Sequence, residues 1–198
     1  LYKLASMDLV NLPLIRYIGE TKKPLIISTG MSNIGQIDEA IECFKSTGNN
    51  NLILLHCNSS YPSAPEEMNL NVIKSLKHYY KIPIGLSDHT IGLLASQTAI
   101  TLGANVIERH FTLDRTFEGP DHILSSEPLE MEKLVSLTKQ IPKIIGSGNK
   151  QIQPSEFQTL NQQRKSLYAR VNIKKGQVIN NNMIDIKGPG GGLLPKYL

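Results

Sequence analysis

The sequence predicts an α/β fold that is built on a parallel β-sheet. Five short apolar segments recur along the chain at a spacing of about 25 residues, with amphipathic patterns between them. Each segment is nearly continuous in apolar character, as expected of strands that are covered on both faces. Because crossovers between parallel strands are right-handed, two arrangements remain open, a doubly wound sheet or a closed barrel.

The expected elements follow one another in a regular order. The five expected strands are residues 1–6, 24–31, 51–59, 82–89 and 105–111. Residues 34–48 carry apolar side chains along one helical face, and the helix is expected to end at Gly48. A second helix is expected over residues 92–104, ending at Gly103, and a third over residues 128–145.

The chain changes character after this third helix. Residues 1–145 have the α/β pattern, whereas residues 146–165 are polar and weakly patterned and are expected to form a linker. Residues 166–198 combine short β-like segments with glycine turns, which predicts the beginning of a small β-rich module. So short a module rarely folds alone, so we expect it to be truncated. The start at Leu1, without an initiator methionine, predicts a missing N-terminal part.

Composition and charge argue against several classes of function. Of the 198 residues, 40% are hydrophobic and 19% charged, and no apolar run approaches the roughly 20 residues of a membrane helix. The formal net charge of +4 comes from scattered lysines, which disfavours nucleic acid as a partner and suits an anionic small substrate. Cys43 and Cys57 form no disulfide framework and fit a reducing cytoplasm.

Polar side chains gather where the expected strands end. In a parallel α/β fold the carboxyl ends of the strands lie on one face, and ligands bind there. Five strand ends with polar chemistry indicate a site, whereas a single polar strand end would be weak support. The polar positions are Lys3, Ser6, Ser28, Thr29 and the runs 56–60, 87–89 and 108–110.

Two of these strand ends carry a histidine, in the segments GLSDHT (85–90) and VIERHF (106–111). A histidine alone is more often a hydrogen-bonded structural residue than a metal ligand. Two histidines on adjacent strands, His89 and His110, are able to converge on one divalent ion. Asp88 and Glu108 beside them would then orient the rings or bound waters. The spacing leaves the structural and the metal-binding interpretation open.

The other candidate residues are a group that suits an anion and three residues whose roles stay open. The first comprises Lys3, Ser6, Ser59 and Ser87, which together suit an anion, although a lysine at a strand edge is about as common without this role. Asp8 and Asp121 either bind a sugar hydroxyl or move a proton, or they only shape turns. Tyr61 either lines a pocket or packs beside Pro62.

The ordered motifs of this chain resemble those of the sialic acid synthase family. That family includes the N-acetylneuraminate synthases and the related legionaminic acid, pseudaminic acid and spore-coat polysaccharide synthases. The matching segments cover nearly the whole chain. They are YKLASMDLVNLPLI, KPLIISTGM, LLHCNSSYPSAPEEMNL, IPIGLSDHT, GANVIERHFTLDR, GPDH, RKSLYARVNIKKGQVI and KGPGGGLLPKYL. The resemblance implies strands four to eight of a TIM barrel, then a linker, then the first half of a small antifreeze-like (SAF) domain.

The resemblance also implies an activity. Phosphoenolpyruvate would condense with an N-acetylhexosamine, typically N-acetylmannosamine, to give a nonulosonic acid and phosphate. A divalent metal, manganese or magnesium, would bind His89 and His110 and polarise the sugar aldehyde. The implied catalytic residues are Asp8 and Lys3, the implied phosphoenolpyruvate contacts are Lys3, Ser6, Ser59 and Ser87, and the implied sugar contacts are Tyr61 and Asp121.

The resemblance further implies a cytoplasmic enzyme that forms a domain-swapped homodimer. Many members carry Arg-Pro-Gly where this chain has Gly188, Pro189 and Gly190, so recognition of the sugar's acyl group stays open. Strands one to three would be missing, and we expect the isolated chain to be inactive. The alternatives are another phosphoenolpyruvate-dependent aldol synthase, a metal-dependent hydrolase barrel and a sugar-binding fragment without activity.

Overall fold

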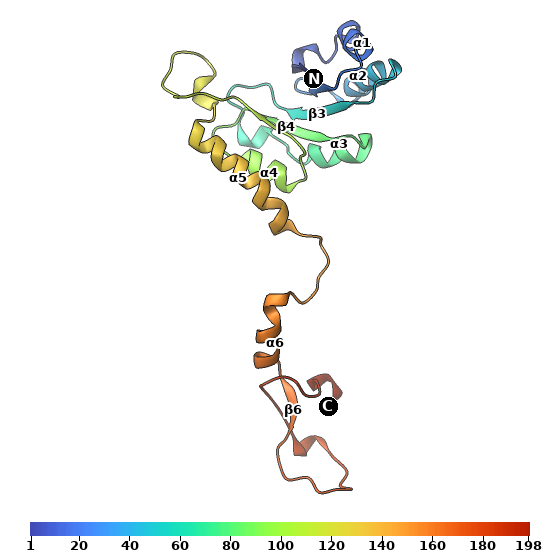
Figure 1. Ribbon diagram of the computed structural model, residues 1–198, viewed down its shortest axis with the longest axis vertical. Coiled ribbons are helices and arrows are strands. Elements are labelled where there is room, and N and C mark those ends of the chain that lie inside the picture. The colour runs from blue at the N-terminus through green and yellow to red at the C-terminus, as the bar shows by residue number, and fades with distance from the viewer. The chain divides into compact units, whose positions relative to one another are not determined.

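The computed structural model describes residues 1–198, which form two compact units, Leu1–Gly146 and Ser147–Leu198 (Figure 1). The first unit contains one parallel sheet whose strands pair in sequence order. Its strands are β1 (Tyr2–Leu4), β2 (Leu25–Ser28), β3 (Leu52–Cys57), β4 (Ile84–Asp88) and β5 (Ile107–Arg109). The five expected strands are therefore all present, each shorter than its apolar segment.

Five α-helices accompany these strands in the first unit. They are α1 (Leu12–Glu20), α2 (Ile34–Ser46), α3 (Val72–Tyr80), α4 (Leu94–Thr101) and α5 (Pro128–Ile145). The sequence analysis predicted α2, α4 and α5, and missed α1 and α3. A local signal for α1 was present, because the Asn11 side chain caps the helix by accepting from the Leu14 N–H and Pro13 lies in the first turn. No helix has the length and hydropathy that crossing a bilayer requires.

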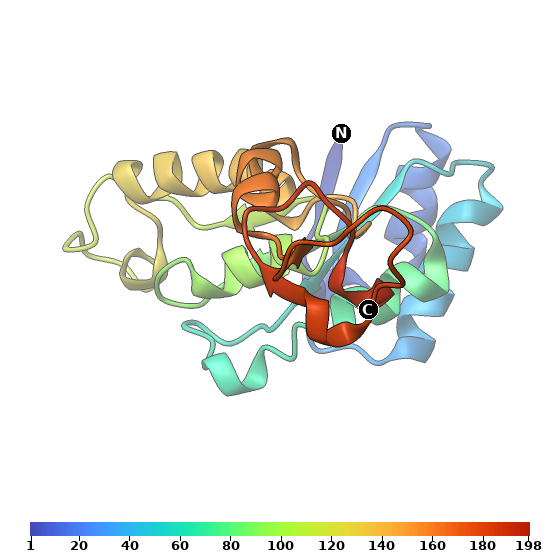
Figure 2. The ribbon, with the colours of Figure 1, turned by 90° about the horizontal axis from the view of Figure 1, so that it is seen from below.

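Strand order decides between the two arrangements that the sequence left open. When every right-handed crossover leads to the next strand along the sheet, all helices fall on the same face. A doubly wound sheet instead reverses direction and places helices on both faces. Helices α1 and α2 lie near one edge of the sheet, and α5 lies near the opposite edge (Figure 2). The strands thus have an outer face toward the helices and an inner face that is free of them, as in part of a barrel.

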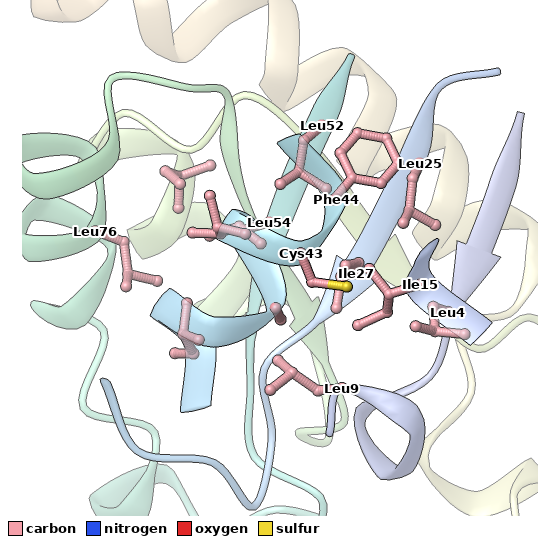
Figure 3. Close-up of a cluster of buried hydrophobic side chains, with 14 of the residues drawn as sticks. Leu4, Leu9, Ile15, Leu25, Ile27, Cys43, Phe44, Leu52, Leu54 and Leu76 are labelled. Atoms are coloured by element: carbon pink, nitrogen blue, oxygen red, sulfur yellow. The ribbon is translucent and has the colours of Figure 1, made fainter. Parts of the chain in front are cut away.

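The outer face of the sheet holds the hydrophobic core (Figure 3). Alternate residues of β2, β3 and β4 are fully or nearly fully buried there, and Phe44 of α2 and Ile15 of α1 pack among them. These strand residues are Leu25, Ile27, Leu52, Leu54, Ile84 and Leu86. Because successive side chains of a strand point to opposite faces, the residues between them point to the inner face.

One contact shows how strongly the sheet curls. β1 and β5 are the two edge strands, so in a flat sheet they would lie roughly 19 Å apart, four strand spacings. Nevertheless, Lys3 Nζ of β1 lies 3.6 Å from Glu108 Oε1 of β5. The sheet must therefore curve toward its inner face, as a half-barrel does, and this curvature brings the inner-face side chains of all five strands together.

The second unit is small and is described by itself. It contains α6 (Phe157–Gln163) and an antiparallel pair of strands, β6 (Ser166–Ala169) and β7 (Ile184–Lys187). The stretch that was expected to act as a linker, residues 146–165, therefore contains a helix that the sequence analysis did not predict. The reason is that α6 has few apolar residues, so its helical periodicity is too weak to recognise.

Candidate active site

Polar inner-face side chains meet at the carboxyl ends of the strands. Lys3 Nζ donates to Ser28 Oγ at 2.9 Å, and Ser87 Oγ donates to Glu108 Oε1 at 2.8 Å. Since Lys3 also pairs with Glu108, these contacts connect four strands across the curved face. Glu108 is thus the link between Lys3 and Ser87, two of the residues that the sequence analysis assigned to anion binding.

Ser6 and Ser59 approach each other around Gly30. The Gly30 N–H donates to Ser6 Oγ at 3.0 Å. A Cβ atom at Gly30 would lie only 2.2 Å from Ser59 Oγ and 2.8 Å from Ser6 Oγ. The absence of a side chain at this position therefore allows two hydroxyls from different loops to share one small space. All four members of the expected anion group lie at this end of the sheet.

In the protein as its gene encodes it, we expect Gly30→Ala to lower the kcat/KM of a reaction carried out at this site by about 10²-fold, because displacement of catalytic groups by about 1 Å is sufficient for a loss of that size. The new methyl group must move both serine hydroxyls. Gly35→Ala is the matched control, since its Cβ would meet only Asn33 Oδ1, at 3.4 Å. Steady-state kinetics on both variants check the prediction, and equal activities would show that the close approach at Gly30 has no role in turnover.

The two histidines lie together at the ends of β4 and β5. Their ring centroids are 5.3 Å apart, and the Tyr61 ring lies 4.1 Å from His89 and 5.7 Å from His110. His110 Nδ1 is 3.6 Å from Asp121 Oδ2. The structure thus places both expected sugar contacts, Tyr61 and Asp121, beside the expected metal ligands. Tyr61 remains 50% exposed, so its ring is open to a ligand.

The hydrogen bond of His89 assigns its tautomer. His89 Nδ1 lies 2.8 Å from the carbonyl oxygen of Asn58, which can only accept. Nδ1 is therefore the protonated nitrogen of the neutral ring, and Nε2 carries the lone pair. Ser87 Oγ is 3.5 Å from this Nε2, so Ser87 lies between the histidines and the anion group.

Burial and charge shift three pKa values at the site. Burial raises the pKa of Cys57, but hydrogen bonds with His89, Ser6 and Ser59 and the charge of His89 together leave it lowered. Burial lowers the pKa of His89, but hydrogen bonds with Cys57 and Asn58 and the nearby negative charges leave it raised. Burial raises the pKa of Tyr61, and the charges of Cys57, Asp121 and Glu108 raise it further.

The two imidazoles fit a divalent metal in part. The Nδ1 atoms of His89 and His110 each face an oxygen atom, the usual way in which proteins orient a histidine ligand. No group of three or more His, Cys, Asp or Glu side chains has the arrangement of a metal site. An ion held here would have two protein ligands, and its other positions would be left to water or substrate oxygens.

Two polar residues near the strand ends form no hydrogen bond with the other candidate residues. Asp8 accepts from Asn11 Nδ2 at 3.3 Å and forms no other side-chain hydrogen bond. His56 is on the outer face, where it bonds the Met68 carbonyl oxygen, and burial lowers its pKa. Their positions follow from the strand and turn geometry. Polar character at a strand end does not by itself show which face a side chain occupies.

Neither Asp88 nor Glu108 hydrogen-bonds a histidine ring, so these carboxylates do not orient the rings by direct contact, and their expected role toward bound waters stays a prediction. Asp88 is fully buried on the outer face and forms an ion pair with Arg109, because it precedes His89 in the strand and points the opposite way. Glu108 does share the inner face with His110, but its partners are Lys3 and Ser87.

Two residues of the site were not recognised as functional candidates, Asn58 and Gly30, and the contacts of Glu108 with Lys3 and Ser87 were not foreseen. Alternation could have placed Glu108 correctly, because counting back two residues from His110 puts it on the same face. Asn58 acts through its backbone oxygen and Gly30 through the lack of a side chain. Neither property can be recognised from the chemistry of the side chains in the sequence.

Comparisons with known proteins find relatives that match nearly the whole chain. The NeuB family matches residues 1–150. An uncharacterized protein of Methanocaldococcus jannaschii is 48% identical over 197 residues, which are 100% of this chain and 58% of that protein. The N,N'-diacetyllegionaminic acid synthase of Campylobacter jejuni is 42% identical over 195 residues, which are 98% of this chain and 58% of that enzyme.

A solved structure gives the same result. The N-acetylneuraminic acid (sialic acid) synthetase of Leptospira borgpetersenii, in complex with citrate, superposes with a TM-score of 0.74 at 40% identity. The match covers 80% of this chain and 55% of that one. The chain thus spans little more than half the length of these relatives. Family match, sequence identity and fold agree, and the chain belongs to the NeuB family of sialic acid synthases and related enzymes.

Proposed function

We propose that the protein condenses phosphoenolpyruvate with an amino-sugar aldehyde, an N-acetylhexosamine, to give a nonulosonic acid and inorganic phosphate. One observation carries the proposal, the position of Ser87. Ser87 belongs to the anion group, and its hydroxyl donates at 2.8 Å to Glu108, the partner of Lys3, and lies 3.5 Å from His89 of the histidine pair. Two substrates held by these two groups would therefore meet at neighbouring positions, as bond formation between them requires.

Phosphoenolpyruvate is assigned to the anion group. The Lys3 ammonium is positively charged, and Glu108, at 3.6 Å, balances part of that charge. Ser6, Ser59 and Ser87 add hydroxyl donors. Charge-assisted hydrogen bonds of this kind are the strong ones for carboxylate and phosphate oxygens. We propose that Lys3 binds the substrate anion and holds the reacting carbon near His89.

The amino-sugar is assigned to the histidine side. Tyr61 offers a half-exposed ring, and Asp121 offers a carboxylate that accepts hydrogen bonds from sugar hydroxyls. When bound to His89 and His110, manganese or magnesium would supply Lewis-acid polarisation of the aldehyde. The carbon–carbon bond would form between the methylene carbon of phosphoenolpyruvate and the aldehyde carbon. The former aldehyde oxygen takes up a proton and becomes a hydroxyl. Water then adds to the former enol carbon and loses its protons, and the carbon–oxygen bond to phosphate breaks as the keto group forms.

Two carboxylates are available for the proton transfers. Glu108 lies within the anion group, in contact with Ser87 and Lys3. Asp8 lies two residues after Ser6, in the short 3-10 helix Ser6–Asp8, and forms its side-chain contact only with Asn11. We propose that Asp8 assists in activating the water, which requires a change in its side-chain rotamer when substrates bind.

The test is phosphate release from phosphoenolpyruvate by the protein as its gene encodes it. N-acetylmannosamine, its 6-phosphate, and the legionaminic and pseudaminic acid precursor sugars are offered separately, with Mn²⁺ and with a chelator. Release that requires one of these sugars together with the metal supports the proposal and names the acceptor. A folded protein that binds phosphoenolpyruvate and releases no phosphate with any of them would contradict it.

The remaining parts of the proposal concern assembly. We propose that residues 166–198 belong to a SAF-like domain, and that the enzyme is a cytoplasmic, domain-swapped homodimer. The antiparallel strands β6 and β7 are compatible with such a domain. We also propose that these 198 residues alone are inactive, since they span just over half of the relatives. Light scattering gives the oligomeric state, and the phosphate assay on both lengths of chain tests the activity.

A further inference from the structure

A buried ion pair precedes the two histidines. Asp88 and Arg109 are the last paired residues of β4 and β5, and His89 and His110 follow them directly. Arg109 Nη1 lies 2.5 Å from Asp88 Oδ2, and the two side chains are 1% and 0% exposed. Because successive side chains alternate, this pair lies on the outer face of the sheet while the histidines face the site.

The Arg109 guanidinium joins three segments around the site. Its Nη2 donates to the carbonyl oxygens of Thr90, at 2.8 Å, and Leu124, at 3.3 Å. Its Nε donates to Ser126 Oγ at 2.8 Å. Thr90 follows His89 in the chain, and the other two acceptors belong to the segment that follows Asp121. One cation therefore ties together the β4 end, the β5 end and the loop that carries the partner of His110.

The backbone of each histidine is held by the same network. The Ser126 N–H donates to the His110 carbonyl oxygen at 2.8 Å, and Ser126 is the residue that Arg109 binds. On the β4 side, Asp88 Oδ1 accepts from both the N–H and the hydroxyl of Thr90. The ion pair thus fixes the position at which each strand presents its imidazole.

We infer that Arg109, together with Asp88, is a positioning residue that sets the separation and orientation of the His89 and His110 rings for a divalent ion. The inference rests on the proposed function. An arginine is required because its planar fork donates in several fixed directions at once, whereas a lysine offers one compact ammonium. Buried ion pairs contribute little net stability, so a geometric role explains why the network is so completely bonded.

The test measures Mn²⁺ affinity by the electron paramagnetic resonance signal of free Mn²⁺, without turnover. In the protein as its gene encodes it, Arg109→Lys is expected to bind Mn²⁺ about 10- to 100-fold more weakly, the usual loss when an outer partner of a metal ligand is changed. Binding of phosphoenolpyruvate without metal, measured by calorimetry, should stay within about twofold. An unchanged Mn²⁺ affinity in the folded variant would overturn the inference.

Arg115→Lys is the matched control, because Arg115 pairs with Glu130 in the same region and contacts neither histidine. It should lower thermal stability without changing Mn²⁺ affinity. If Arg109→Lys does not fold, Ser126→Ala removes only the hydroxyl that accepts from Arg109 Nε. That variant should bind Mn²⁺ several-fold more weakly, and wild-type affinity would overturn the inference. A wild-type protein that does not bind Mn²⁺ would instead contradict the proposed metal site itself.

Discussion

His89→Ala is expected to reduce phosphate release by at least about 10³-fold, because several kcal/mol of Lewis-acid stabilisation is lost with the metal and each 1.4 kcal/mol is a factor of ten. The substitution removes the nitrogen whose lone pair faces the site while Asn58 holds the other nitrogen. His110→Ala should have a similar effect, since the two rings lie 5.3 Å apart and would share one ion. The measurement is the rate of phosphate release at saturating Mn²⁺, together with Mn²⁺ affinity.

His78→Ala is the control for these variants, because His78 is an exposed residue near the end of α3. It should retain wild-type rate and affinity. If His89→Ala and His110→Ala also kept full Mn²⁺ affinity, the histidines would be structural residues, and the proposed role of the metal would be wrong. Loss of activity with Mn²⁺ affinity intact would point to a role in binding the sugar instead.

Lys3→Met is expected to lower kcat/KM for phosphoenolpyruvate by about 10²- to 10³-fold, since a charge-assisted hydrogen bond contributes about 1.5 to 3 kcal/mol and the cation also balances the substrate's charge. Methionine keeps most of the length and removes the ammonium. Without it, Glu108 would lose the cation at 3.6 Å, and substrate anions would meet an uncompensated carboxylate. The KM for the sugar should change little, because Tyr61 and Asp121 are untouched.

Lys23→Met serves as the comparison for Lys3→Met. Lys23 lies at the opposite end of the sheet, with its Nζ 5.6 Å from the Tyr2 ring, and it is exposed. It should leave both KM values unchanged, which separates a local effect from a general effect of net charge. A Lys3→Met enzyme whose KM for phosphoenolpyruvate equals that of the wild type would remove Lys3 from the anion group.

Much of the architecture followed from the apolar segments, and the reason is physical. Strands of a curved parallel sheet need continuous apolar character, so all five were recognisable, and the lysine, histidine and serine positions at their ends were recognisable with them. To predict which face of the sheet a residue occupies, the exact last residue of the strand must be known. A shift by one position reverses every side chain, which is why Asp88 was placed beside the histidines when it lies behind them.

Other parts of the site could not be predicted because they depend on distant segments. The contact between Lys3 and Glu108 exists only because the sheet curls, and curvature is a property of five strands together. The bond from His89 to Asn58 joins residues 31 positions apart through a backbone oxygen, to which side-chain identity contributes nothing. The residue types in the sequence predicted Lys3, His89 and His110 as site residues, whereas their hydrogen-bond and ion-pair partners depend on how the chain packs.

Three residues on the anion side of the site and the two sugar-facing residues differ in where the chain supports them. Lys3, Ser87 and Glu108 stand on strands that share their other face with the hydrophobic core. Tyr61 and Asp121 stand on loops that connect strands to helices. Loops tolerate exchange far better than core strands do. One scaffold can therefore diversify toward new acceptor sugars by replacing the segments around residues 60–64 and 113–123 while Asn58 and Ser59 are kept, and loop grafting between relatives is the direct way to re-engineer acceptor choice.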